Sequence, residues 1–181
     1  MPYSTRMCTF FNRYKGESGF PEELTKTLPA ADLQTLKEYA SWHDQAEKDE
    51  GVILNRSWLE VADRADSMSA AEIASEMKKV RALSDGRQVA RYRAVIAKLS
   101  PAGQELVNNF VVAHVRPMVL TDDEEALANR VPDFYKAQII GSREYVRSGK
   151  WPAFPKEKTA VQQKGRANGA ALSPGSSLTN H

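Results

Sequence analysis

Apolar residues recur every three or four positions along most of the chain between Pro29 and Tyr145. This spacing lines them up on one face of an α-helix, whereas a half-buried strand would alternate with a period of two. The clearest stripe, in residues 30–47, consists of Leu33, Leu36, Ala40 and His43. Because short connections separate such stripes, the sequence predicts an all-α fold, a single bundle of about six helices.

Glycine, proline and serine residues predict where the helices end. Gly51 predicts a break after the first stripe, and residues 84–86 (Ser-Asp-Gly) predict a turn between two later helices. Ser100 followed by Pro101 predicts that one helix stops and another starts, because proline fits the first turn of a helix but not its interior. Pro132 predicts a further interruption.

Two segments match the capping box, in which a Ser or Thr and a Glu three residues later bond each other's backbone amides through their side chains. They are Ser69-Ala-Ala-Glu72 and Thr121-Asp-Asp-Glu124. Each segment therefore predicts the start of a helix.

The two ends of the chain differ from its middle. Residues 5–14 have some strand character, but no second strand of similar quality could pair with them, so we expect a helix or an arm packed on the bundle. After residue 155 the chain has no aromatic residue and too little apolar surface to offset the entropy of ordering. We therefore predict an N-terminal arm (1–19), a helical bundle domain (20–155) and a disordered C-terminal tail (156–181).

An aromatic and proline cluster, Trp-Pro-Ala-Phe-Pro, lies just before this tail in residues 151–155. Two large apolar side chains beside a disordered tail usually pack on their own domain, and covering the bundle is the interpretation we favour. The alternative is a short docking motif for another protein, with Trp151 and Phe154 as the candidate partner-binding residues.

The net charge of +2 conceals a segregated pattern. Residues 17–76 hold 14 acidic against five basic residues, whereas residues 77–98 hold seven basic residues against one acidic residue. A row of exposed bases on a helix neutralises phosphates, which makes this segment the candidate nucleic-acid interface. The interpretation that we favour is that its bases pair with the acidic stretch across helix contacts or simply keep the bundle soluble. The candidate nucleic-acid-binding residues are Arg87, Arg91, Arg93 and Lys98.

Signals for metal binding and catalysis are weak. His43 and Glu47 share a helix face at a spacing of four residues and could hold one ion, but the sequence indicates no third ligand. The other histidines are His114, on a later helix, and His181, in the tail. Cys8 has apolar neighbours typical of packing rather than of an activated nucleophile. We therefore predict no metal site, no cofactor and no catalytic residue.

By elimination, the leading hypothesis is a non-enzymatic helical interaction protein, an adaptor or regulator that binds a protein partner. The first alternative is a nucleic-acid-binding accessory protein that uses the basic segment, and the second is an enzyme whose site is assembled from residues far apart in the chain. A lone cysteine and the lack of a signal or membrane-spanning segment favour a cytoplasmic location and no membrane partner. The sequence does not indicate an oligomeric state.

Overall fold

The computed structural model describes residues 2–16, 19–116 and 123–150. Within these ranges the chain forms seven α-helices, one short 3-10 helix and no strand, which confirms the all-α prediction. In chain order the elements are α1 (Pro2–Tyr14), α2 (Glu22–Thr27), α3 (Ala30–Asp63), η1 (Ala65–Ser67), α4 (Ala70–Ala97), α5 (Pro101–His114), α6 (Glu124–Arg130) and α7 (Pro132–Ser148).

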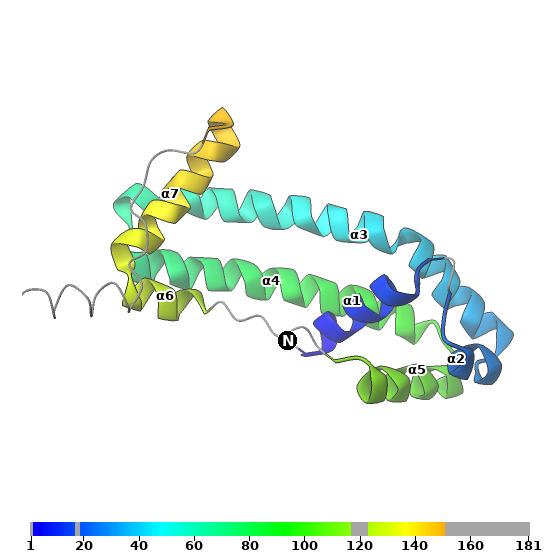
Figure 1. The fold of residues 1–181 in the computed structure, drawn as a ribbon. Coiled ribbons are helices and arrows are strands. Elements are labelled where there is room, and N and C mark those ends of the chain that lie inside the picture. Colours follow the sequence, from blue (N-terminus) through cyan, green and yellow to red (C-terminus); the bar gives the residue numbers. More distant parts are fainter. Residues whose placement is uncertain (1, 17–18, 117–122, 151–181) are drawn as a thin grey trace, which may run out of the picture.

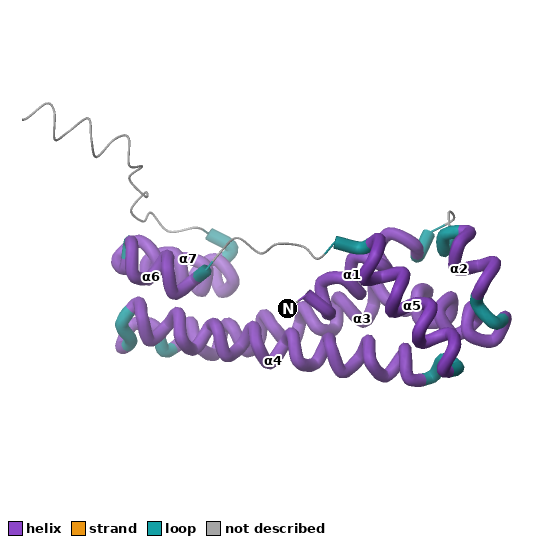
Figure 2. Tube along the Cα trace, turned by 90° about the horizontal axis from the view of Figure 1, so that it is seen from below, coloured by secondary structure: helices purple, strands orange, loops and turns teal. Residues whose placement is uncertain are grey.

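Two long antiparallel helices, α3 and α4, run the length of the molecule and are joined through η1 (Figure 1). α1, α2 and α5 gather at the end where α3 begins, and α6 and α7 gather at the opposite end, beside η1 (Figures 1 and 2). No helix among the described residues combines the length and the apolar character needed to cross a membrane.

The core consists of two apolar clusters, one at each end of the α3–α4 pair. α3 contributes Leu36 to the first cluster and Val61 to the second, and α4 contributes Ile73 to the second and Ile96 to the first. The other helices bury their apolar faces against these two ends, and the area removed from water supplies most of the stabilisation.

The predicted breaks at Gly51 and at residues 84–86 are wrong, because α3 and α4 continue through both. A glycine in a helix costs only about 1 kcal/mol relative to alanine. Burial of apolar faces on both sides of each position outweighs this cost. Ser84 is 3% exposed, and its hydroxyl donates to Glu50 on α3 at 2.7 Å, so the residue predicted to begin a turn instead joins the two helices.

Most of the remaining helix-end predictions agree with the structure. Ser69 and Glu72 form a complete capping box at the start of α4, and Ser100 caps α5. The second capping box is wrong in detail: the cap of α6 is Asp123, whose carboxylate accepts from the backbone amide of Glu125 at 3.1 Å. A carboxylate at this position serves as well as a hydroxyl, because both accept from the free amides of the first turn.

The N-terminal segment is part of the core. Residues 5–14 lie within α1, and Met7, Phe10 and Phe11 are fully buried in the first apolar cluster. The candidate residues Trp151 and Phe154 and the tail at 156–181 lie outside the described residues.

Continuity of the long helices has a direct consequence for stability. A Cβ atom added at Gly51 or Gly86 would meet no neighbour within 4 Å, and neither glycine has a positive φ. Gly51→Ala and Gly86→Ala should each raise the free energy of unfolding by about 0.4–1 kcal/mol, because alanine restricts the unfolded chain and favours the helix. Urea unfolding followed by circular dichroism measures the change.

Gly149 provides the control for this prediction. It follows α7 with a φ of +71°, a conformation that an alanine adopts only with strain. Gly149→Ala should therefore destabilise the chain. If the two interior substitutions also destabilised it, helix continuity at those positions would be contradicted.

Candidate functional site

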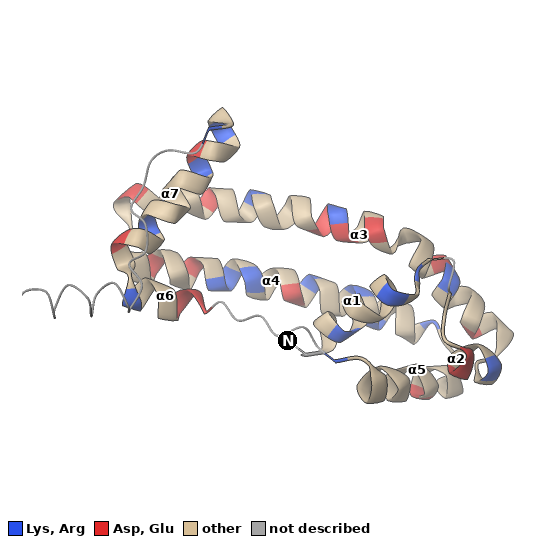
Figure 3. Ribbon diagram, viewed as in Figure 1, with Lys and Arg blue, Asp and Glu red and all other residues tan. Residues whose placement is uncertain are grey.

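Most bases of the segment 77–98 are paired with carboxylates. Figure 3 shows the acidic start of α6 beside basic residues of α4, where Lys78 bonds Glu125 at 3.0 Å and Arg81 bonds Glu124 at 3.1 Å. Of the seven bases, those in ion pairs with a described carboxylate are Lys78, Lys79, Arg81, Arg87 and Arg91.

Arg87 binds Glu50 across the middle of the α3–α4 pair. Its Nη2 donates to Oε1 at 2.6 Å, and its Nε donates to both carboxylate oxygens at 3.1 Å. Glu50 is 7% exposed, and burial by itself would raise the pKa of its carboxylate. The hydrogen bonds from Arg87 and Ser84 outweigh burial and hold the pKa of Glu50 below its ordinary value.

One turn further along α4, Arg91 forms the centre of a second polar cluster. Its Nε donates to the hydroxyl of Tyr39 at 2.9 Å, and its Nη2 bonds the carboxylate of Glu47. The hydroxyl of Tyr92 donates to Oε1 of the same carboxylate at 3.1 Å. Tyr92 is fully buried, and burial raises the pKa of its hydroxyl far above the ordinary value.

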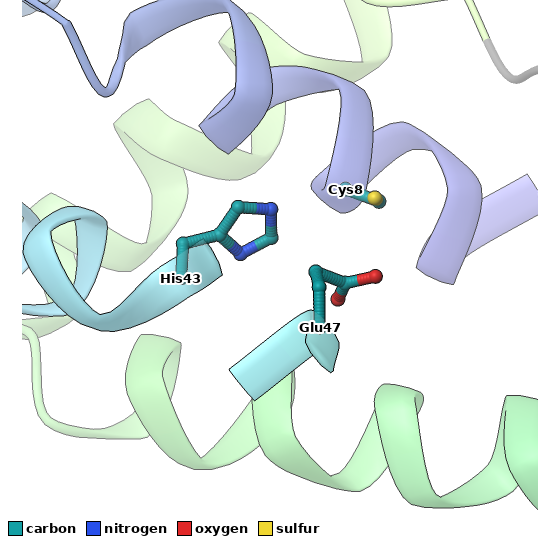
Figure 4. A group of neighbouring side chains, drawn as sticks. All are labelled: Cys8, His43 and Glu47. Carbon is teal, nitrogen blue, oxygen red and sulfur yellow. The ribbon is translucent and has the colours of Figure 1, made fainter. Parts of the chain in front are cut away.

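Cys8, His43 and Glu47 meet beside this cluster (Figure 4). Each offers one ligand atom, and these three atoms lie within 4.8 Å of one another. The thiol comes from α1, and the imidazole and carboxylate come from successive turns of α3. The sequence spacing thus correctly predicted that His43 and Glu47 share a face, but it missed the third member.

The electrostatics of this group argue against nucleophilic catalysis. Burial, and secondly the charge of Glu47, raise the pKa of the Cys8 thiol, so the thiol is protonated at neutral pH. Burial lowers the pKa of His43, so its imidazole is neutral there. An activated cysteine requires the opposite, a pKa lowered by a nearby positive charge.

A groove of about 510 Å³ is the second notable feature, and it lies where α1, α4 and α5 meet. Its apolar part comes from α4 and α5, and its charge comes from Arg6 and Arg93. The lining residues are Tyr3, Arg6, Arg93, Ile96, Ala97, Gln104, Asn108, Val111 and Val112.

The two arginines of the groove differ from those along the middle of α4. Neither Arg6 nor Arg93 forms an ion pair with any carboxylate of the described residues. The Nε atom of Arg6 is buried without a hydrogen-bond partner there. Arg93 is exposed, and its guanidinium lies over the ring of Tyr3, 5.6 Å from the ring centre.

The structure thus separates the four candidate nucleic-acid-binding residues. Arg87 and Arg91 face glutamates of α3, Arg93 lines the groove, and Lys98 caps the C-terminal end of α4 in an exposed position. Sequence reasoning missed Arg6 because it treated residues 1–19 as an arm. The repeat of Met7, Phe10 and Phe11 on one helical face is the signal that could have placed α1 in the bundle.

Comparison with known proteins gives no family. No protein-family model matches the chain, and none of the curated proteins or solved structures compared with it gives a significant match. Function is therefore inferred from the geometry of the described residues.

The buried carboxylate of Glu50 predicts a pH dependence of stability. Because its pKa is below the ordinary 4.5 in the folded chain, ionised Glu50 stabilises the fold above pH 4.5, and this contribution is lost as the pH falls through the folded-state pKa. Glu50→Gln should lower the free energy of unfolding at neutral pH by about 1–3 kcal/mol. Below pH 4.5 the difference from the unsubstituted protein should shrink.

Urea unfolding across this pH range measures the difference. Asp49→Asn changes an exposed carboxylate next to Glu50 in the chain and is the matched control, with little effect at either pH. A Glu50→Gln deficit that stayed constant from neutral to acid pH would contradict the prediction.

Proposed function

We propose that the protein is a non-enzymatic helical interaction protein, and that the α1–α4–α5 groove binds an acidic segment of a protein partner that also carries apolar side chains. One observation supports this most directly. Arg6 and Arg93 lie beside apolar residues in an open groove and have no carboxylate partner among the described residues.

The charge of the groove selects the chemistry of the partner. A buried guanidinium nitrogen without an acceptor, as at Nε of Arg6, costs about 1–3 kcal/mol relative to a bonded one. A carboxylate from a partner in the groove would pair with the guanidinium charges of Arg6 and Arg93, and hydrogen bonds between charged groups are roughly twice as strong as neutral ones. An acidic side chain of the partner therefore contributes more binding free energy in this groove than a neutral or basic one.

The apolar residues select a partner with hydrophobic anchors. Ile96 and Val111 are buried beneath the groove, and Val112 is 66% exposed at its edge. Apolar side chains of a partner would cover this surface and exclude water from the arginines, which strengthens their ion pairs. Amphipathic helices bind grooves of this kind through anchors spaced three and four residues apart.

A protein partner fits these residues better than a nucleic acid. Binding along a phosphate backbone needs a row of free cations, and Arg87 and Arg91, which would extend such a row, are held by Glu50 and Glu47. The groove is also largely apolar, whereas nucleic-acid interfaces are strongly polar and positive. Docking by Trp151 and Phe154 and a cytoplasmic location stay predictions from the sequence.

Fluorescence anisotropy of a labelled synthetic peptide that alternates leucine with aspartate and glutamate tests the proposal. The double variant Arg6→Glu, Arg93→Glu should weaken binding at least about tenfold, because each lost charged hydrogen bond contributes roughly 1.5–3 kcal/mol. The double variant Lys37→Glu, Arg56→Glu changes the net charge equally on exposed positions of α3 and should bind like the unsubstituted protein.

Two results would contradict the proposal. One is equal loss of binding in both double variants, which would indicate a non-specific charge effect. The other is tighter binding of a labelled DNA or RNA duplex than of the peptide, with a steep salt dependence, which would favour the nucleic-acid alternative.

A crosslinking experiment tests whether the peptide binds in the groove or on another part of the surface. Val112 and Leu83 are almost equally exposed, at 66% and 65%, but only Val112 lines the groove. A photoreactive amino acid at position 112 should crosslink the peptide, and the same group at position 83 should not. Crosslinking from position 83 alone would place the binding surface elsewhere.

A further inference from the structure

We propose that Cys8, His43 and Glu47 form a binding site for a zinc ion between α1 and α3. None of the three residues lines the α1–α4–α5 groove, so the site does not depend on the proposed function. Three types of zinc ligand converge there, one buried nitrogen has no hydrogen-bond partner among the described residues, and hydrogen bonds from neighbouring side chains surround the group.

The three side chains offer the ligand set that zinc prefers. Zinc in proteins is bound by cysteine sulfur, histidine nitrogen and carboxylate oxygen at about 2.0–2.3 Å. Ligand atoms at those distances in a tetrahedron lie roughly 3.3–3.8 Å apart. The atoms here lie within 4.8 Å of one another, so side-chain movements of about 1 Å close the site around an ion.

The imidazole of His43 supplies the second, independent observation. The residue is fully buried, yet its Nε2 has no hydrogen-bond partner among the described residues. Buried polar atoms are normally bonded, and an exception calls for a physical explanation. Figure 4 shows the His43 ring turned toward the space between Cys8 and Glu47, where an ion would accept the free electron pair of this nitrogen.

The surrounding side chains orient the ligands as they do around known metal ions. The other ring nitrogen of His43, Nδ1, lies 3.4 Å from the hydroxyl of Tyr39. In the tautomer protonated at Nδ1, this N–H donates a hydrogen bond to the hydroxyl, and Nε2 is free to bind the ion. The amide of Asn12 lies 3.4 Å from the sulfur of Cys8. Partners of this kind fix the orientation of metal ligands.

Glu47 retains an oxygen for the ion. Arg91 and Tyr92 both bind its Oε1, and these two hydrogen bonds leave its Oε2 available to an ion. On binding, the ion takes the place of the thiol proton of Cys8, which is released to solvent, while the ligand bonds form to sulfur, nitrogen and oxygen. The thiolate offsets part of the added positive charge, Glu47 lies between the ion and Arg91, and a water molecule would complete the tetrahedron.

The experiment uses the full chain without a histidine tag, purified with zinc and then dialysed. Elemental analysis should find one zinc ion per chain, and added zinc should raise the unfolding midpoint of metal-free protein. With cobalt in place of zinc, a thiolate-to-cobalt charge-transfer band in the near ultraviolet should report sulfur ligation. Cys8→Ala should abolish this band and reduce bound zinc by at least tenfold.

Matched substitutions separate ligation from general effects on the fold. Glu47→Gln should weaken zinc binding, whereas Glu60→Gln, at an exposed position of the same helix, should not. His114→Gln removes a histidine outside the cluster and should retain the metal. Because His43 is fully buried, the decision rests on the Cys8 and Glu47 variants, whose helical content is checked by circular dichroism.

The proposal is overturned if zinc remains well below one ion per chain in the presence of excess metal. It is also overturned if Cys8→Ala binds zinc as the unsubstituted chain does, or if cobalt binds without a charge-transfer band. Loss of zinc in the Cys8→Ala and Glu47→Gln variants, with retention in the two control variants, supports it.

Discussion

The polar contacts between the middle of α3 and the middle of α4 organise the rest of the structure. Glu50 accepts from Ser84 and Arg87, and one turn away Glu47 binds Arg91, between an apolar cluster at each end of the helix pair. These contacts favour one register of the two long helices, because sliding either helix by one turn would leave at least one of the two glutamates without an arginine partner. The register in turn sets where the short helices pack.

The apolar spacing between Pro29 and Tyr145 was sufficient to predict an all-α chain, since it reflects burial along one helical face. It was not sufficient to place every helix boundary. Gly51 and the Ser-Asp-Gly sequence at 84–86 have the local chemistry of a break, but tertiary contacts on both sides keep α3 and α4 continuous. The cap at Ser69 was predictable because it depends on residues three positions apart.

The candidate sites were only partly accessible from the sequence. The spacing of His43 and Glu47 follows from helix geometry alone, but the approach of Cys8 depends on how α1 packs on α3. Arg87, Arg91 and Arg93 look alike in the sequence, and only the long-range pairing of α3 with α4 distinguishes the two that are held by glutamates. Which arginines are held by glutamates depends on contacts between residues more than 30 positions apart in the chain.

Arg87 and Arg91 of α4 hold the two long helices together instead of facing a partner. A double-mutant cycle with Glu50→Ala and Arg87→Ala, measured as free energies of unfolding, tests it most directly. The structure predicts a favourable coupling of about 1–3 kcal/mol, typical of hydrogen-bonded partners that include a buried charge. Additive effects of the two substitutions, with coupling near zero, would show that Arg87 does not depend on Glu50 and would contradict the account.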